Sequence, residues 1–342
     1  MLSAGILALP GERQLFLMML HLHRQGAATP EEAETLFAQF QGKEIEPPPD
    51  RSPQEDARIL AYDAVEQDGG DRVRLAKQAL ALDEDCIDAR LALWDLAFPD
   101  QAEALTLAER AHDLARAKLT EVPEDFAGDD LWQCGLDFRP TIRAHAALAL
   151  TLWARGERAR ALRLAEETVA LNPADNTGMR WRMANWYLTE RQRDKAVRLL
   201  RAYPDDPVAP MQYAVALAEF ARSGESKKAR RRLRAAVEAN PMTLCFLTCG
   251  AGPKKPAYIE LFAPGELTEA LVWHHVVTEA WQAVPGAMDW LQRCTRQRWF
   301  VSRMAAATVQ MLAELAERTE DDPAEAGPGP RELNAAPDQD AC

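Results

Sequence analysis

The sequence is poor in residues that interrupt helices or favour strands. It contains only 17 Gly in 342 residues, and clusters of β-branched residues are rare. Ala, Leu, Glu and Arg dominate, and these residues favour helix. We therefore expect helix along nearly the whole chain. Apolar residues make up 47% of the sequence, which is enough to form a buried core.

Recognisable catalytic motifs are also missing. No Gly-rich phosphate loop follows a strand pattern, and neither Gly-x-Ser-x-Gly nor His-Glu-x-x-His occurs. No set of residues supplies a nucleophile and a base in a recognisable context. The sequence therefore predicts a protein that is not an enzyme and that has no cofactor.

Long uncharged apolar segments are absent as well. No segment reaches the roughly 18 apolar residues that suggest a membrane helix, and no basic leader precedes the apolar run at residues 2–9. The cysteines, at positions 86, 134, 245, 249, 294 and 342, lie too far apart to resemble a disulfide framework. These features predict a cytoplasmic protein that does not bind membranes.

Cys245 and Cys249, with His274 and His275 further along the chain, are the best candidates for a metal site. Their three-residue gap is compatible with paired zinc ligands. However, no second pair stands at a defined spacing, and His274 falls on the apolar face of its expected helix. We expect buried thiols and a packed histidine here, and no metal.

A repeat is present. Pro173, Pro207 and Pro241 are each 34 residues apart, and each closes a stretch that reads as two short amphipathic helices. This interval is the period of the tetratricopeptide repeat. The second helices carry small or apolar residues at i, i+4 and i+7, where neighbouring helices must approach closely. These sets are Ala104/Ala108/Ala111, Ala161/Ala165/Thr168, Ala196/Leu200/Tyr203 and Ala229/Leu233/Ala236, with a degenerate copy at Arg72/Ala76/Ala79.

The period predicts an all-α fold: a tetratricopeptide-type right-handed α-solenoid with N-terminal and C-terminal helical caps. Thr29, Pro30 and Gly42 are typical of the start and end of a helix in the N-terminal cap, and Ser52, Pro53 and Glu55 begin the repeats in the same way. The expected parts are residues 1–45 as the N-terminal cap, 52–120 as repeats 1 and 2, 121–139 as an insertion loop, 140–241 as repeats 3 to 5, 242–318 as C-terminal helices that include 266–283 and 286–318, and 319–342 as a disordered acidic tail.

Several segments resemble a known group. Arg58 to Ala64, Leu80 to Cys86, Leu171 to Asn176, Asn240-Pro241 and Trp281 to Leu291 are similar to bacterial tetratricopeptide-repeat proteins related to the suppression-of-tumorigenicity family. The resemblance covers residues 28–292. It implies a repeat scaffold without a defined activity. Some similar proteins carry a zinc motif with a Cys-x-Cys pattern, which this chain lacks.

The first helices of such repeats line a concave groove. Arg and Asn there can hold the carboxylates and backbone of a peptide, and Trp supplies desolvated contact area. Core packing is the alternative role for each such residue. We predict a non-catalytic scaffold that binds a protein or peptide segment in the groove of repeats 3 and 4; the sequence leaves the partner and the oligomeric state open. Projection of repeats 3 to 5 gives the candidates Arg143, Trp153, Arg180, Trp181, Asn185, Met211 and Tyr213.

Charge is unevenly distributed. The chain has a net charge of −13, but residues 139–234 hold 20 Lys/Arg against 10 Asp/Glu, a local net of +10 that leaves −13 − 10 = −23 for the rest. The run from Lys227 to Arg234 is the densest part. Its apolar positions Ala229 and Leu233 face inward and leave the charges solvated, but the run could also contact phosphates. The alternative function is therefore a nucleic-acid-associated regulatory factor that uses the basic segment 139–234.

Overall fold

The computed structural model describes residues 6–7, 11–26, 38–40, 43–122, 130–249 and 262–321. Every regular element in these ranges is an α-helix, which confirms the all-α prediction. The helices are α1 (Glu12–Gln25), α3 (Pro53–Val65), α4 (Gly69–Leu82), α5 (Ile87–Ala97), α6 (Gln101–Leu119), α7 (Arg139–Ala154), α8 (Arg158–Leu171), α9 (Met179–Thr189), α10 (Arg193–Ala202), α11 (Ala209–Ser223), α12 (Lys227–Ala239), α13 (Pro241–Cys249), α14 (Leu267–Ala283), α15 (Ala287–Thr295) and α16 (Arg298–Asp321).

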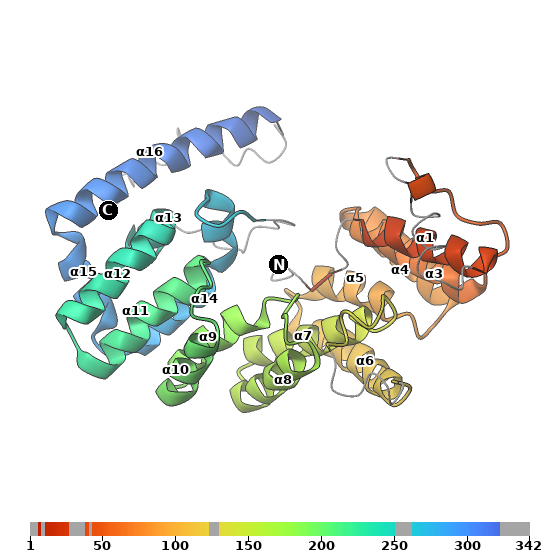
Figure 1. Ribbon diagram of the computed structural model, residues 1–342, viewed down its shortest axis with the longest axis horizontal. Coiled ribbons are helices and arrows are strands. Elements are labelled where there is room, and N and C mark those ends of the chain that lie inside the picture. Colours follow the sequence, from red (N-terminus) through yellow and green to blue (C-terminus); the bar gives the residue numbers. More distant parts are fainter. Residues whose placement is uncertain are drawn as a thin grey trace, which may run out of the picture.

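Helices that follow one another along the chain pack together from α3 to α12. The pairs α3–α4, α5–α6, α7–α8, α9–α10 and α11–α12 are in contact, and the second helix of each pair also contacts the first helix of the next. Figure 1 shows these pairs as a curved row that runs from the orange to the teal part of the chain. None of the described helices combines the length and the apolar character needed to cross a bilayer.

The predicted small-residue sets lie in the contacts between these helices. The alanines of α6, α8, α10 and α12 in these sets are fully buried, and Arg72, Thr168, Leu200 and Leu233 are also buried. Tyr203 is only half-buried. Because a methyl group adds little bulk, alanine lets the backbones of adjacent helices come close without leaving a void.

The turns within the pairs have a common hydrogen bond. Gly156 has φ of 82°, and the amide of Glu157 donates to the carbonyl of Leu152 at 2.9 Å. Arg191 occupies the matching position with φ of 57°, and the amide of Gln192 donates to Tyr187 at 2.7 Å. A non-Gly residue in this left-handed region is uncommon, so the turn before α10 retains its geometry with an arginine at the position normally favourable to glycine.

The predicted helix start at Ser52 is confirmed in detail. The Ser52 hydroxyl accepts a hydrogen bond from the Glu55 amide at 3.2 Å, and the Glu55 carboxylate accepts one from the Ser52 amide at 2.7 Å. This capping box satisfies two backbone donors that the first turn of α3 would otherwise leave free.

The C-terminal part differs from the prediction. The stretch 286–318 was expected to be one helix, but the chain breaks after Thr295 and forms α15 and α16. An additional helix, α13, follows Pro241 directly. α14 packs against α9, α11 and α13. The 34-residue period does not cover this segment, so the positions of α13 to α16 could not be derived from it. Residues 322–342, most of the expected acidic tail, lie outside the described residues.

The N-terminal part packs against α3 and the main core. α1 contacts α3, and Ile6 is fully buried in the main core. Only residues 38–40 of the second expected helix, 29–42, are described, and they are helical. In the predicted insertion, residues 130–138 form turns; the Leu131 amide donates to Leu171 at 3.0 Å and Trp132 is 3% exposed. Residues 123–129 lie outside the described ranges.

Candidate binding surface

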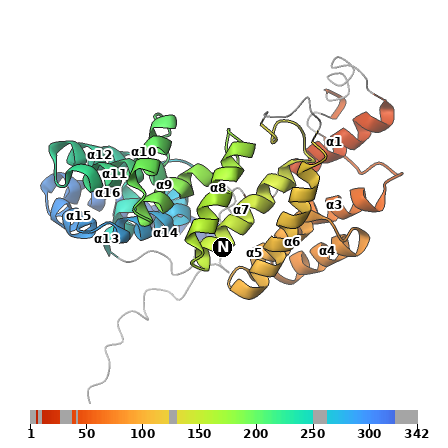
Figure 2. The same ribbon diagram turned by 90° about the horizontal axis from the view of Figure 1, so that it is seen from below.

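The second helices α8, α10 and α12 present an exposed row of cations. Figure 2 shows the three helices in succession along one edge of the molecule. The Ala, Leu and Thr positions described above face the core, so the helical period turns the Arg and Lys side chains outward. We name these cations the basic outer face. Its members are Arg163 on α8, Arg191 in the turn before α10, Arg198 and Arg201 on α10, and Lys227, Arg231, Arg232 and Arg234 on α12.

Ion pairing sets these cations apart from their neighbours. Among the described residues, no ion pair within 4.0 Å involves any member of the basic outer face. Neighbouring cations differ: Lys195 pairs with Glu166 at 2.7 Å, and Lys228 pairs with Glu219 at 3.0 Å. The guanidinium of Arg234 lies 5.2 Å from the ring centre of Trp299. The basic outer face is thus a row of exposed cations without direct ion pairs in the described part of the chain, and an anionic ligand would be attracted to it.

A depression adjoins this face at the turns between helices. Its volume is about 730 Å³, and it lies between the α9–α10 turn, the α11–α12 turn and the segment after α14. Arg191, Arg193, Asp194 and Lys195 form its charged side, on which cations outnumber the one carboxylate. Leu188, Phe220 and Val284 contribute apolar surface, and Phe220 is held by a parallel stack on Trp290 with ring centres 4.5 Å apart. The depression can therefore accept a small apolar group next to a negative charge.

Arg143, predicted to line the groove, is fully buried in an ion cluster. Its guanidinium donates to Asp88 at 2.8 Å and to Glu12 at 2.9 Å. Arg139 also approaches Glu12, at 3.3 Å. The two carboxylates raise the pKa of Arg143 further above its usual range, although burial opposes the shift. Arg143 therefore links α7 to α1 and α5.

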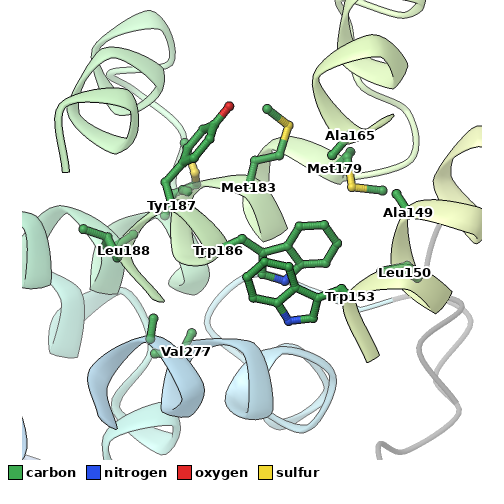
Figure 3. Packing of buried hydrophobic residues seen from close by; sticks show 14 of the residues in the cluster. Ala149, Leu150, Trp153, Ala165, Met179, Met183, Trp186, Tyr187, Leu188 and Val277 are labelled. Atoms are coloured by element: carbon green, nitrogen blue, oxygen red, sulfur yellow. The ribbon is translucent and has the colours of Figure 1, made fainter. Parts of the chain in front are cut away.

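Trp153 and Trp181 also make intramolecular contacts. Trp153 stacks on Trp186 with ring centres 4.2 Å apart and planes within 5° of parallel (Figure 3). Its indole nitrogen donates to Glu279 of α14 at 3.0 Å. The half-buried Trp181 donates to Asp206 at 2.9 Å and meets Trp273 edge-on. Both indoles thus contribute to the contacts that hold α14 against α7 and α9.

The other four candidates are similarly engaged. Arg180 pairs with Asp206 at 2.9 Å and keeps 16% of its side chain exposed. Asn185 is fully buried and donates to the carbonyls of Trp181 and Pro210. Met211 is 1% exposed, and the buried Tyr213 hydroxyl donates to the carbonyl of Asn240 at 2.9 Å. The structure does not bring the seven candidates together as one open surface.

The cysteine and histidine candidates are also packed. His274 is 8% exposed, its ring lies 5.2 Å from that of Phe246, and Nδ1 lies 3.0 Å from the carbonyl oxygen of Leu271. Burial lowers the pKa of neighbouring His275 to about 3. Cys245 is 5% exposed and its thiol faces the carbonyl of Met304. The side chain of Cys249 lies outside the described residues. Within the described part, no group of three or more His, Cys, Asp or Glu residues is placed to hold a metal.

Sequence reasoning identified only the α12 part of the basic outer face. The charges on α8 and α10 were counted in the segment total but were not resolved into one surface. A usable signal was present: Arg198 and Arg201 are three residues apart and flank the inward-facing Leu200, as Arg231, Arg232 and Arg234 flank Leu233. Because Leu200 and Leu233 are expected to face the core, the helical period alone places the arginines beside them on the solvent-exposed side of α10 and α12.

Neither a protein-family model nor a curated protein matches this chain.

Proposed function

We propose that this all-helical protein is a tetratricopeptide-type right-handed α-solenoid with helical caps at both ends, and that it acts as a non-catalytic cytoplasmic scaffold. Its partner in this proposal is an acidic segment of another polypeptide. The segment binds on the basic outer face, and an apolar side chain of the same segment enters the depression beside Arg191. No chemical step is assigned to the protein.

The observation that carries the proposal is that no cation of the basic outer face forms an ion pair within 4.0 Å with a carboxylate of the described residues. Arginine binds carboxylates through two parallel hydrogen bonds, which adds geometric specificity to the attraction between charges. A rigid row of helices holds these guanidinium groups in place before binding, so the partner bears most of the ordering cost. The depression adds a contact that depends on shape as well as charge.

The groove of repeats 3 and 4, favoured by the sequence, has less support. Arg143, Asn185 and Tyr213 are already used in buried hydrogen bonds, and α14 packs along α9 and α11. A partner that contacted these residues would have to displace α14 or break those bonds. The basic outer face needs no such rearrangement.

A nucleic acid is the second candidate for the same face. Its phosphates would also neutralise the unpaired cations. Two features favour the acidic polypeptide. The whole chain carries −13, which repels a long polyanion more than a short acidic segment. In addition, α8, α10 and α12 contain no aromatic residue on which bases could stack.

Fluorescence anisotropy tests the proposal with two labelled probes: a peptide of alternating Glu and Leu residues, and a duplex RNA. The full chain is compared with Arg198→Glu/Arg231→Glu and with Lys77→Glu/Arg116→Glu, which makes the same charge change at exposed positions of α4 and α6. We expect the first variant to bind the peptide at least ten-fold more weakly and the second to bind it like the wild type. Equal weakening by both variants would reject a defined site, and tighter binding of the RNA would favour the nucleic-acid candidate.

A further inference from the structure

The three helices that carry the basic outer face hold a large excess of positive charge. α8, α10 and α12 contain 13 Lys or Arg against four Asp or Glu. Three of the four carboxylates pair with cations that are not members of the basic outer face: Glu166 with Lys195, Asp194 with Arg193, and Glu238 with Arg303 of α16. These pairs leave the cations of the basic outer face available to an acidic segment.

The chain itself contains a segment of opposite charge, residues 322–342, which we call the tail. The tail lies outside the described residues; its sequence holds five Asp or Glu and one Arg, a net charge of −4. Leu333 directly follows Glu332, and Asp338 and Asp340 come a few residues later. The tail thus combines carboxylates with a large apolar side chain, which is the chemistry that the proposed function assigns to the partner.

The tail is long enough to reach the basic outer face. It follows α16, whose Arg303 lies 3.9 Å from Glu238 of α12. A helix rises about 1.5 Å per residue, so the end of α16 at Asp321 lies about 27 Å from Arg303. α11 contacts both α10 and α12, which places α10 about 20 Å or less beyond α12. An extended chain spans about 3.3 Å per residue, so Asp338 and Asp340 can lie up to about 56 Å and 63 Å from Asp321.

Attachment to the same chain makes even a weak contact effective. A segment tethered by a short linker has an effective concentration in the millimolar range. A contact with a Kd of about 1 mM, far weaker than a typical complex between two proteins, is then enough to occupy the face for a large part of the time. A few charge pairs on an exposed surface supply an attraction of this size. A free partner of similar charge must therefore compete with the tail.

We propose that the tail binds the basic outer face of the same chain and competes there with the partner. Asp338 and Asp340 pair with exposed arginines of α10 and α12, such as Arg198 and Arg231, and the partner must displace them. A partner with more carboxylates than the tail, or with an apolar side chain that fills the depression, is thereby favoured over weakly acidic segments. The competition rests on the proposed function, but the contact between tail and face requires no partner and can be tested without one.

Zero-length cross-linking of the full chain with a carbodiimide, followed by mass spectrometry, tests the contact itself. The reagent joins a carboxylate to a lysine amine only where the two groups touch. We expect links from Asp338 or Asp340 to Lys227, an exposed member of the basic outer face, in a species with the 38.1 kDa mass of one chain. Lys77, exposed on α4, is the reference. Links to Lys77 as frequent as those to Lys227 would overturn the proposal, and so would links to Lys227 found only in a species of twice that mass, which would place the tail on a second copy.

Fluorescence anisotropy with the labelled Glu-Leu peptide tests the competition. The Glu332→Gln/Asp338→Asn/Asp340→Asn variant should bind the peptide at least about three-fold more tightly than the wild type, because the neutralised tail no longer occupies the face. The control Glu66→Gln/Glu103→Gln/Glu109→Gln makes the same charge change at exposed positions and should bind like the wild type.

Equal tightening by both variants would overturn the proposal, because net charge would then set the affinity. Unchanged affinity of the tail variant would overturn it as well, and weaker binding by Arg198→Glu/Arg231→Glu would in that case leave the proposed function intact. If none of these proteins binds the peptide, the proposed function fails, and the links to Lys227 alone decide whether the tail occupies the face.

Discussion

The guanidinium of Arg143 lies between the carboxylates of Asp88 and Glu12, at 2.8 Å and 2.9 Å respectively, and all three side chains are at most 3% exposed. These residues come from three separate helices, α7, α5 and α1. The cluster therefore holds the N-terminal helix against α5 and α7. A buried charge with two partners is costly to break, because loss of one group leaves the others without compensation in a poorly solvated site.

Replacement of Arg143 with Met should lower the free energy of unfolding by about 3–5 kcal/mol, since Asp88 would remain buried without its counter-ion and Glu12 would keep only its contact with Arg139 at 3.3 Å. Urea denaturation followed by circular dichroism measures this change. Arg231→Met on the basic outer face, which removes an exposed and unpaired arginine, should change the free energy by no more than about 0.5 kcal/mol. Similar effects of the two substitutions would show that the cluster does not stabilise the fold.

Substitutions in the stack between Trp153 and Trp186 should lower the free energy of unfolding, and the loss should grow with the size of the group removed. Trp186→Ala removes a side chain that is 2% exposed and should lower the free energy of unfolding by about 3–5 kcal/mol. Trp153→Phe keeps an aromatic ring but loses the hydrogen bond to Glu279, so about 1–2 kcal/mol is expected. Thermal and urea denaturation of both variants checks the order. A larger loss of unfolding free energy for Trp153→Phe than for Trp186→Ala would contradict the packing described.

Glu269 links the start of α14 to the start of α11 and to Asn240 after α12. Its carboxylate accepts hydrogen bonds from Ala209, Asn240 and Gly265, each at 2.8 Å, and burial raises its pKa. Glu269→Ala should lower the free energy of unfolding by about 2–4 kcal/mol because three buried donors lose their acceptor. It should also increase hydrogen exchange in α14 more than in α4. Unchanged exchange in α14 would show that this contact does not hold the helix in place.

His112 should make the protein less stable in mild acid. Its Nε2 is buried without a hydrogen-bond partner, and its ring lies 4.6 Å from that of His145. Burial lowers the pKa of His112 from 6.5 to about 4, and the charges of His145 and Arg116 act in the same direction. The folded state therefore resists protonation more than the unfolded state does. The neutral form is favoured at pH values above 6.5, and stability is lost as the pH falls from 6.5 towards 4.

The His112→Gln variant isolates this contribution. Because the ring is only half-buried, we expect the wild type to lose about 1 kcal/mol more than the variant between about pH 7.5 and pH 5. Urea denaturation at the two pH values supplies the comparison. An equal loss in both proteins would mean that His112 titrates normally.

Local patterns in the sequence predicted local structure well. The capping box at Ser52 and the inward alanines of α6, α8 and α12 depend on contacts within a turn or on helical periodicity, and both can be derived from spacing. The position of α14 cannot, because it depends on contacts between residues about 60 positions apart, such as Glu269 with Ala209.

The groove candidates show a second limit. Arg143, Trp153 and Asn185 have the chemistry that binds a peptide, but the same chemistry also serves buried ion pairs, stacked rings and backbone hydrogen bonds. The choice between the two roles depends on which helices lie opposite, and the repeat pattern does not contain that information. Arg198 and Arg201 could have been placed outside from the burial of Leu200 alone, because that inference needs only the helical period.

Hydrogen–deuterium exchange of the full chain, with and without a saturating Glu-Leu peptide, tests most directly where a partner binds. We expect slower exchange at the turn around Arg191 and in α10 and α12, with little change in α7 and α9. Slower exchange confined to α7, α9 and α14, with none in α10 or α12, would contradict this expectation and restore the groove as the binding surface.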